Sequence, residues 1–385
     1  MSVQIEQLTA TDWDEGMAFL NEVFAEHSPH DFATLLPSIY QPTDEYMACN
    51  YAVREEGKIC AIVGLFPTHW QVGETRLKVG GIGGVSTHSS VRGKGYMQLL
   101  MKHCVQRMQA EDYDLSWLGG QRQRYGYFGY ETCGQKIHLS LTKSNVRHVF
   151  GSIEPLCFEP LAEADSIRME AALSLHEAQD VYSSRGGTDT FHRFLVNGYY
   201  QPHVALDSGG NMVGYLAADA VGGSVVELLG IDSSSAIDMA RSWVQSREQE
   251  GACFDVSPTS FEFLQRLSAI DDGNSISASG NWQIFDWQAT VQALLQVRSK
   301  AGGLANGAVV IGIEGYGSLR IRVQGEDLSC EKVADTPMAT WSPLTAMRVL
   351  FGPLPASAVV EIPTAAAALS AWCPLPLGWS CLDGV

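Results

Sequence analysis

The sequence predicts an α/β (α+β) fold divided into several domains, and three observations support this prediction. The chain has 385 residues, more than one ordinary hydrophobic core accommodates, which suits two to three domains. Short runs of strand-like alternation take turns with amphipathic helical segments along most of its length. A glycine-rich strand beginning at Gly80 leads through a short loop into a helix with one apolar face.

Composition excludes several classes of function. The apolar fraction of 45% and the charged fraction of 18% are those of a folded protein. The net charge of −18 argues against a nucleic-acid partner, because such binding depends on clustered Lys and Arg, and it suits a cationic substrate better. The nine cysteines include no C-x-x-C pair, which favours buried thiols in a reducing compartment over a zinc site or a disulfide framework.

Neither a leader nor a membrane segment is expected. Residues 1–6 lack a basic segment followed by an apolar run, and no stretch approaches the length of a membrane span. We therefore expect a cytoplasmic protein with no membrane partner and no metal.

The first elements are expected to follow the order strand, helix and three antiparallel strands. Periodicity and turn residues predict a strand over 3–8, a helix over 12–24 capped by Thr11, and strands over 47–54, 58–72 and 75–87. Between the helix and the second strand, the segment 27–42 mixes aromatics, prolines, His27 and His30 without a period. From its residues alone the segment suits a packed surface loop. The alternative, that it lines a substrate pocket, is implied only by the family resemblance described below.

The stretch from Gly80 to Tyr96 predicts an anion site. Four glycines crowd one strand, where glycine is favoured only if the backbone bulges or something lies close against it. They are Gly80, Gly81, Gly83 and Gly84. The loop 92–96 then brings two glycines and two cations to a helix start, where unpaired N–H groups favour phosphate. The helix has a single apolar face, formed by Met97, Leu100, Met101, Cys104, Val105 and Met108. The alternative is a solvated turn before an ordinary helix.

Strand, R-G-K-G loop and amphipathic helix, in this order, resemble the acetyl-CoA-binding motif of the GNAT N-acetyltransferases. Gly93 and Gly95 match the two small positions of Q/R-x-x-G-x-G/A, and Ser90 stands at the Gln/Arg position. Neither G-x-x-x-x-G-K-[ST] nor G-x-G-x-x-G is present here, which argues against nucleotide hydrolysis and a Rossmann site. The resemblance implies acetyl-CoA as cofactor, bound by Val85, Ser86, Thr87, Arg92, Gly93, Lys94, Gly95 and Tyr96. The Val85 N–H would serve as the oxyanion donor.

The run Tyr-Gly-Tyr-Phe-Gly-Tyr over 125–130 narrows the resemblance to GNAT enzymes of the Eis (enhanced intracellular survival) type. By that resemblance Tyr125 is the general acid that returns a proton to the coenzyme A thiolate. A phenol with a reference pKa of about 10 can do this at neutral pH. The alternative, which we expect for Tyr127, Phe128 and Tyr130, is a core aromatic in a glycine-rich turn.

Two further domains are expected after the catalytic domain, which spans 1–145. The block 146–282 resembles a second, degenerate GNAT unit, with helices over 163–175, 188–195 and 235–249 and strands over 199–206, 212–218 and 225–231. Asp232-Ser233-Ser234-Ser235 stands where its phosphate loop would lie, so this copy is not expected to bind acetyl-CoA. Residues 283–385 resemble a sterol-carrier-protein-type-2-like domain. The expected order is thus two GNAT-like mixed-sheet domains and a smaller α+β domain.

The segment from Cys373 to Val385 is expected to be a docked tail. In Eis-type enzymes such a tail brings the terminal carboxylate into the first domain's active site, so the resemblance makes Val385 the base. The acids between Gly84 and Tyr130, namely Glu111, Asp112 and Asp114, lie beyond the helix. No cysteine has a recognisable histidine partner, which favours direct transfer over a covalent acyl-enzyme.

The acceptor is expected to be a small-molecule amine, cationic or like a polyamine or an aminoglycoside. The resemblance also implies a homo-oligomer, a hexamer. Two other classes of function stay open: a sensor that binds acetyl-CoA without turnover, and a carrier of lipid or another hydrophobic ligand in the last domain.

Overall fold

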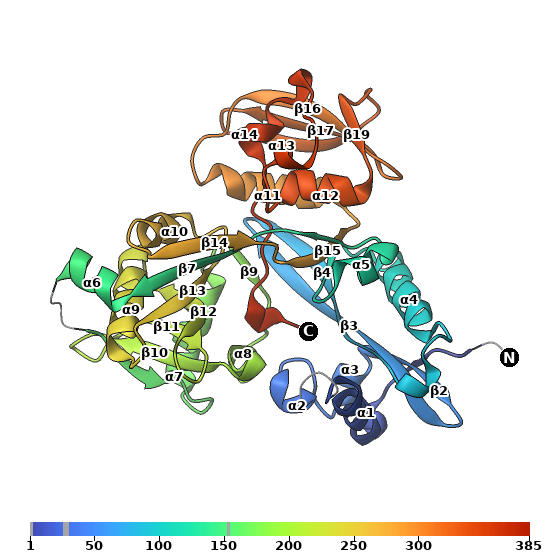
Figure 1. Cartoon of the computed structure of the whole chain (residues 1–385), viewed down its shortest axis with the longest axis horizontal. Coiled ribbons are helices and arrows are strands. Elements are labelled where there is room, and N and C mark those ends of the chain that lie inside the picture. Colours follow the sequence, from blue (N-terminus) through green and yellow to red (C-terminus); the bar gives the residue numbers. More distant parts are fainter. Residues whose placement is uncertain (1–2, 26–30, 152–154) are drawn as a thin grey trace.

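The computed structural model describes residues 3–25, 31–151 and 155–385, and they form three lobes, each built around one sheet (Figure 1). Two large mixed sheets are followed by a smaller four-stranded sheet, as the predicted fold class requires. Within the described residues, no helix is both long and apolar enough to cross a bilayer.

The first sheet carries the predicted anion site. Its strands run in the order β1 (Glu6–Gln7), β2 (Asn50–Glu55), β3 (Lys58–Val72), β4 (Thr75–Thr87), β5 (Leu115–Leu118), β15 (Gly280–Ile284) and β6 (Glu131–Cys133), with β9 (Val181–Ser183) paired to β3. Its helices are α1 (Trp13–Ala25), α2 (Phe32–Leu35), α3 (Asp44–Met47), α4 (Tyr96–Ala110) and α5 (Arg122–Tyr125). The predicted hairpin strands β3 and β4 and the helix α4 are confirmed. The N-terminal helix begins differently, because Thr9 donates its N–H to Asp12 (2.8 Å) and Thr11 is not the cap.

The second sheet has the order β14 (Gly273–Ser277), β7 (Lys136–Thr142), β13 (Gly251–Val256), β12 (Ser224–Gly230), β11 (Met212–Ala218), β10 (Gln201–Leu206) and β8 (Cys157–Pro160). Its helices are α6 (Lys143–Phe150), α7 (Ser166–Glu177), α8 (Thr188–Leu195), α9 (Ser233–Ser246) and α10 (Phe261–Ser268). Asp232 caps α9 by accepting from the N–H of Ser235 (2.7 Å). An acidic cap therefore occupies the place of a glycine-rich phosphate loop.

The two large domains exchange strands. β7, which a boundary near residue 145 leaves in the first domain, pairs with β13 and β14 of the second sheet. β15, at the predicted boundary of 282, pairs with β5 and β6 of the first sheet. The chain therefore enters and leaves the second domain through neighbouring strands. Alternation along a strand identifies its buried face but not its partners, so the sequence could not reveal this exchange.

The third lobe packs on the first. Its sheet has the order β18 (Asp327–Val333), β17 (Gly317–Gln324), β16 (Gly307–Ile313) and β19 (Ala339–Trp341), with helices α11 (Trp287–Ser299), α12 (Pro343–Phe351), α13 (Ala356–Val359) and α14 (Leu369–Trp372). α11 packs against β3 and β4, and one buried cluster joins both lobes. At this junction Trp379 of the tail stacks on Trp117 with ring centroids 5.5 Å apart. The tail is therefore docked, as predicted.

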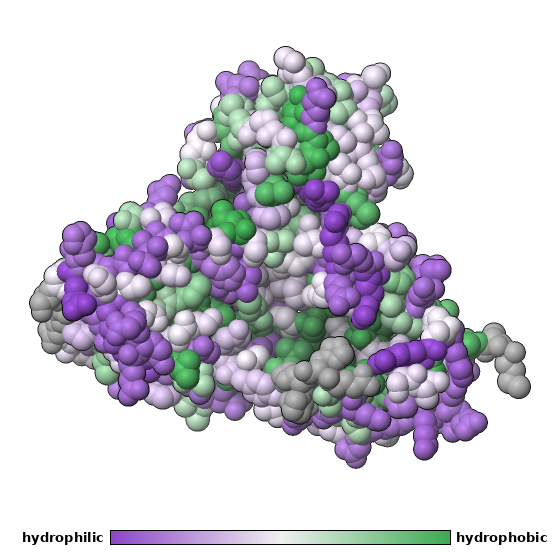
Figure 2. Space-filling view, in the orientation of Figure 1, coloured by the Kyte–Doolittle hydropathy of each residue, from purple (hydrophilic) through white to green (hydrophobic). Residues whose placement is uncertain are grey.

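Hydrophilic residues cover much of the outer surface of the lobes, whereas hydrophobic side chains gather in the hollow between the two large ones (Figure 2). The end of the tail lies between the same two lobes (Figure 1).

Candidate active site

The first sheet opens where β4 and β5 part. These parallel strands pair from Val79–Leu115 to Ile82–Leu118, and β4 then continues to Thr87 without β5 beside it. A cleft of about 940 Å³ lies at this opening. It is lined by Val23, Phe24, Ile82, Gly83, Gly84, Val85, Ser86, Thr87, Val91, Arg92, Gly93, Gly95, Tyr96, Met97, Gln98, Gly119, Gly120, Gln121, Arg124, Tyr125 and Val385. Most of the predicted site residues therefore meet in one place.

The loop before α4 has the backbone of an anion site. Gly93 (φ +89°) and Gly95 (φ +82°) both adopt a left-handed backbone conformation, which is energetically unfavourable for a residue with a side chain. A Cβ atom at either glycine would meet nothing within 4 Å, so backbone conformation rather than space requires glycine there. Gly95 is also the N-cap of α4, a helix of 15 residues. The positive end of this helix dipole and its first N–H groups lie at the cleft.

Lys94 differs from its neighbours in the loop. Its ammonium lies 2.7 Å from Glu55 on β2, and the hydroxyl of Tyr96 also donates to Glu55. Tyr96 lines the cleft, whereas Lys94 does not. The predicted phosphate contact of the Lys94 amide stays a prediction, whereas its side-chain charge is paired with an acid outside the cleft. Glu55 was not singled out in the sequence because it lies 39 residues away from Lys94.

The glycine-rich strand is approached closely by the chain's own residue Val385. A Cβ atom at Gly83 would lie 2.5 Å from the carboxyl carbon of Val385 and 3.0 Å from its oxygen. A Cβ atom at Gly81 would lie 3.0 Å from both methyl groups of Val385. The two glycines thus leave room for the tail, and the main-chain carbonyl of Val385 lies against the strand at the point where the sheet opens.

A β-bulge interrupts β4 at Gly84 and Val85. Ile62 faces Ser86 and Gly64 faces Gly83 across the β3–β4 pair, so one extra residue lies between them on β4. Gly84 adopts φ +58°, and a Cβ atom there would lie 2.8 Å from the hydroxyl of Tyr40. The bulge locally re-aims the backbone, and Val85 directly after it lines the cleft.

Tyr125 ends the short helix α5 and is buried, with 6% of its surface exposed. Burial raises the pKa of its phenol, while the charge of Arg124 and a hydrogen bond to it act to lower that pKa. The ring packs against Gly120, where a Cβ atom would lie 2.9 Å from it. The phenol therefore stays protonated at neutral pH, as a general acid must. Of the residues predicted to be core aromatics, Tyr130 is 1% exposed and hydrogen-bonds Ser116 (2.7 Å), whereas Tyr127 is 90% exposed, so the prediction was wrong for Tyr127.

The structure adds residues that the sequence did not indicate. Val23 and Phe24, from the end of α1, form an apolar wall of the cleft, and Arg124 and Gln98 are further polar members. His27 and His30 lie outside the described residues. His88 and His103 do not line the cleft, since His88 lies 3.4 Å from Glu22 and the His103 ring packs on Tyr51. None of the described residues that line the cleft is a cysteine.

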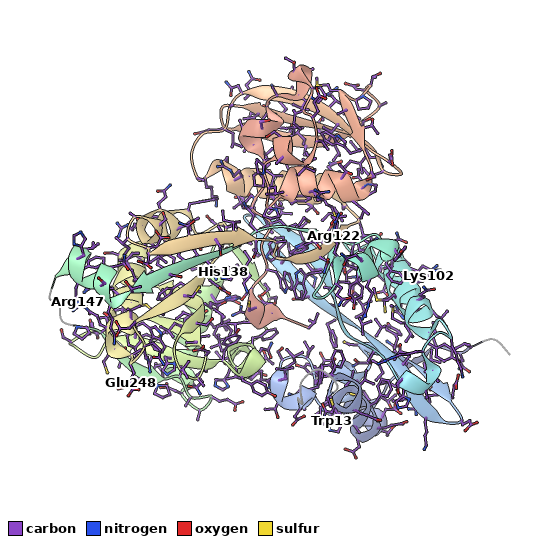
Figure 3. The ribbon with its side chains drawn as sticks, viewed as in Figure 1. Trp13, Lys102, Arg122, His138, Arg147 and Glu248 are labelled. Atoms are coloured by element: carbon purple, nitrogen blue, oxygen red, sulfur yellow. The ribbon has the colours of Figure 1, made fainter. Side chains whose placement is uncertain are left out.

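One group of described side chains could hold a cation, and it lies in the second domain. The ligand atoms of His138, Cys253 and Asp255 all lie within 4.8 Å of one another on β7 and β13. His138 is labelled in Figure 3. However, the ammonium of Lys136 lies 3.1 Å from Asp255 and already compensates its charge. We assign no metal to this group.

A comparison with protein-family models identifies the domain that contains the cleft. Residues 4–133 match the model described as an acetyltransferase (GNAT) domain. This part of the chain is a GNAT acetyltransferase domain. The chain is accordingly an enzyme of the acyltransferase class. No curated protein matches the sequence.

Solved structures share the fold over the whole length of the chain, beyond the GNAT domain itself. A GCN5-related N-acetyltransferase from Kribbella flavida has a TM-score of 0.68 at 16% identity and is covered fully, as is this chain. Eis1 from Mycobacterium abscessus has a TM-score of 0.67 at 12% identity, again with complete coverage of both chains. A probable N-acyltransferase from Enterococcus faecalis V583 has a TM-score of 0.68 at 13% identity, with 98% of each chain covered. At these identities the likeness shows a shared fold.

Proposed function

We propose that the chain transfers the acetyl group of acetyl-CoA directly to a small-molecule amine. The observation that carries this proposal is that Tyr125 and the carboxyl group of Val385 line one cleft, which also reaches the N-terminus of α4. Acetyl transfer to an amine needs an acid for the leaving thiolate and an acceptor for the amine's proton. One group of each kind is present in the cleft.

The cleft fits acetyl-CoA, which when bound supplies the activated acetyl group. The loop 92–96 offers two left-handed glycines and the start of α4, the geometry that phosphates favour. Val85, Ser86 and Thr87 lie where the sheet opens, beside the apolar surface of Val23 and Phe24. In this proposal the amides of 92–96 bind the pyrophosphate, and the N–H of Val85 donates to the developing oxyanion.

Two residues handle protons. The Val385 carboxylate takes a proton from the attacking amine, directly or through a water, and Tyr125 donates its proton to the sulfur of the leaving thiolate. A carboxylate in the cleft also attracts an ammonium, which suits a cationic acceptor such as a polyamine or an aminoglycoside-like amine. A covalent acyl-cysteine has no support among the described lining residues.

The same proposal includes the assembly and the compartment. By its resemblance to Eis-type enzymes, the chain works as a homo-oligomer, a hexamer, in the cytoplasm, and its last domain is sterol-carrier-like. The nine cysteines, all free, agree with a reducing compartment.

The test combines binding with turnover. Acetyl-CoA should raise the melting temperature, and thiol release should be measured with n-hexylamine, benzylamine, spermidine and an aminoglycoside. Intact mass should first verify that the assayed protein ends at Val385. Gly95→Glu should abolish the thermal shift, because it strains a left-handed position and places a carboxylate at the predicted phosphate site. Binding without thiol release from any amine would favour a sensor, and the absence of binding would favour a carrier.

A further inference from the structure

The second domain holds the end of the tail. Residues 378–381 and Asp383 of the tail line a small cavity together with β12 and β13 of the second sheet, at the place where these parallel strands part after two residue pairs. Two residues later, Val385 lies in the cleft of the first domain. The tail therefore bridges the two large lobes (Figure 1).

Arg185 makes the principal contact. Its side chain is fully buried, with Nε 2.7 Å from Oδ1 of Asp383 and Nη2 3.3 Å from Oδ2. The other edge of the guanidinium faces Glu227 on β12, with both N–O distances 2.8 Å. Tyr215 donates its hydroxyl to the same carboxylate (2.8 Å). Two carboxylates thus fix the plane and rotation of one guanidinium, and through it the position of Asp383.

Asn197 makes a second contact, next along the tail. Its amide nitrogen donates to the carbonyl oxygen of Leu382 (2.7 Å) and to the hydroxyl of Ser38 (2.6 Å), a residue of the first domain. The side chain of Leu382 is itself fully buried in the core of the second domain. The tail is therefore held through the backbone and side chain of Leu382 and through the charge of Asp383 before it enters the cleft.

This anchoring limits where the Val385 carboxyl group can be. A residue of extended chain spans at most about 3.6 Å, so an anchor at Asp383 confines Val385 to within about 7 Å of it. Gly81 and Gly83 of the first domain restrict the remaining freedom, since the tail fits closely against them. The second domain therefore anchors the tail at Asp383, and the first domain limits the position of Val385 itself.

We infer that Arg185 and Asn197 of the second domain are positioning residues for acetyl transfer, because they hold the Val385 carboxylate at the reacting amine. The inference rests on the proposed function, in which that carboxylate is the base. It gives the second domain a part in the reaction, although its own loop at Asp232 lacks the features that bind a phosphate. Neither residue lines the cleft, so both act through the tail.

The variant Asp383→Asn tests the inference with little risk to folding. Asn has nearly the same shape, and Arg185 keeps the carboxylate of Glu227 as its partner, so no buried charge is left alone. The matched control is Asp238→Asn, which breaks the Asp238–Arg241 pair (2.8 Å) on α9, also beside a buried arginine of the second domain. Asn197→Ala should free the end of the tail in a second way, by removing the hydrogen bond to the carbonyl oxygen of Leu382.

Three measurements are made on each full-length protein. The first is release of valine from the native protein by a carboxypeptidase, which needs a free chain end. The second is kcat with the best acceptor of the amine panel, and the third is the melting shift with acetyl-CoA. We expect Asp383→Asn and Asn197→Ala to release valine faster and to lose about tenfold to hundredfold in kcat, as a misplaced group does. The acetyl-CoA shift, the KM for acetyl-CoA and all values of the control should stay as in the wild type.

Deletion of Gly384 and Val385 separates the two claims. If the deletion lowers kcat while Asp383→Asn and Asn197→Ala keep wild-type rates and wild-type resistance of Val385 to the carboxypeptidase, the carboxylate is the base. The positioning role of Arg185 and Asn197 is then overturned. If the deletion itself leaves kcat unchanged, the base is elsewhere, and both the proposed role of Val385 and the inference built on it are wrong.

Discussion

Replacing Gly83 by alanine is the sharpest single test of the active site. The backbone of Gly83 is not left-handed, so alanine is compatible with its conformation and the strand itself should tolerate the change. The added methyl group, however, would lie 2.5 Å from the carboxyl carbon of Val385 and 3.2 Å from its Cβ atom. Since carbon atoms in contact lie about 3.5–4.0 Å apart, Val385 must move by about 1 Å or more.

A shift of this size is small for binding but large for proton transfer. A displacement of about 1 Å can lower a rate by about a hundredfold, so we expect kcat to fall by that order while acetyl-CoA still raises the melting temperature. Thiol release with the best acceptor of the amine panel measures the first quantity, and a thermal shift measures the second.

Gly81→Ala is the matched control. Its methyl group would lie 3.0 Å from each of the two methyl groups of Val385 and, at an ordinary contact distance, 3.5 Å from the carbonyl oxygen of Phe66. Val385→Ala removes both of the close contacts. The double variant Gly81→Ala with Val385→Ala should therefore recover activity. Val385→Ala should not rescue Gly83→Ala, because the closest contact of the added methyl group at position 83 is with the carboxyl carbon of residue 385. In a chain shortened by two residues, Gly83→Ala should cost nothing further. A Gly83→Ala enzyme with turnover within threefold of wild type would refute our account of the tail, because about a hundredfold is expected.

Three further predictions concern single groups. Tyr125→Phe should lower turnover by about a hundredfold or more without changing acetyl-CoA binding, and a loss of only a few-fold would make Tyr125 a packing residue. Lys94→Ala should leave the acetyl-CoA thermal shift unchanged, since it keeps the loop amide and removes only an ammonium that pairs with Glu55 outside the cleft. A lost shift would mean that the ammonium itself contacts the cofactor. Burial acts to raise the pKa of Glu227, but the charge of Arg185 and its hydrogen bonds outweigh burial and lower that pKa from 4.5 to about 2. Below pH 4.5 the carboxyl group of Glu227 is protonated in the unfolded state before it is protonated in the folded state, so the free energy of unfolding should fall as the pH drops towards about 2. Urea unfolding would measure this fall, which should be shallower for Glu227→Gln than for the wild type.

Several elements could be predicted from the sequence because their signals are local. The spacing of apolar residues from Met97 to Met108 predicts the helix, and α4 spans Tyr96–Ala110 with Leu100, Met101, Cys104 and Met108 buried. Turns at Glu56-Gly57 and Gly73-Glu74 set the ends of β3, which matches the predicted strand over 58–72. In each case a few neighbouring residues decide the conformation.

The glycine strand is an intermediate case. Four glycines between Gly80 and Gly84 predict a close approach by another group such as a ligand, and resemblance alone suggested, separately, that the tail reaches the active site. The close approach of Val385 to Gly81 and Gly83 agrees with that suggestion, but the chemical role of its carboxyl group stays a prediction. The assignments of Tyr125 as acid and Val85 as oxyanion donor also stay predictions.

Only the tertiary structure decided which strand belongs to which sheet and what holds the tail. β7 and β15 exchange between domains because strand partners are chosen by backbone hydrogen bonds to residues more than a hundred positions away. Arg185 meets Asp383 across 198 residues, and nothing near either residue in the sequence indicates the other. By itself the sequence determined helices, hairpins and a phosphate-type loop, since short-range sterics and periodicity specify these. Burial of a charge between distant segments depends on how the whole chain packs. The contacts of Arg185 and Asn197 that hold the tail before Val385 could therefore be seen only in the tertiary structure.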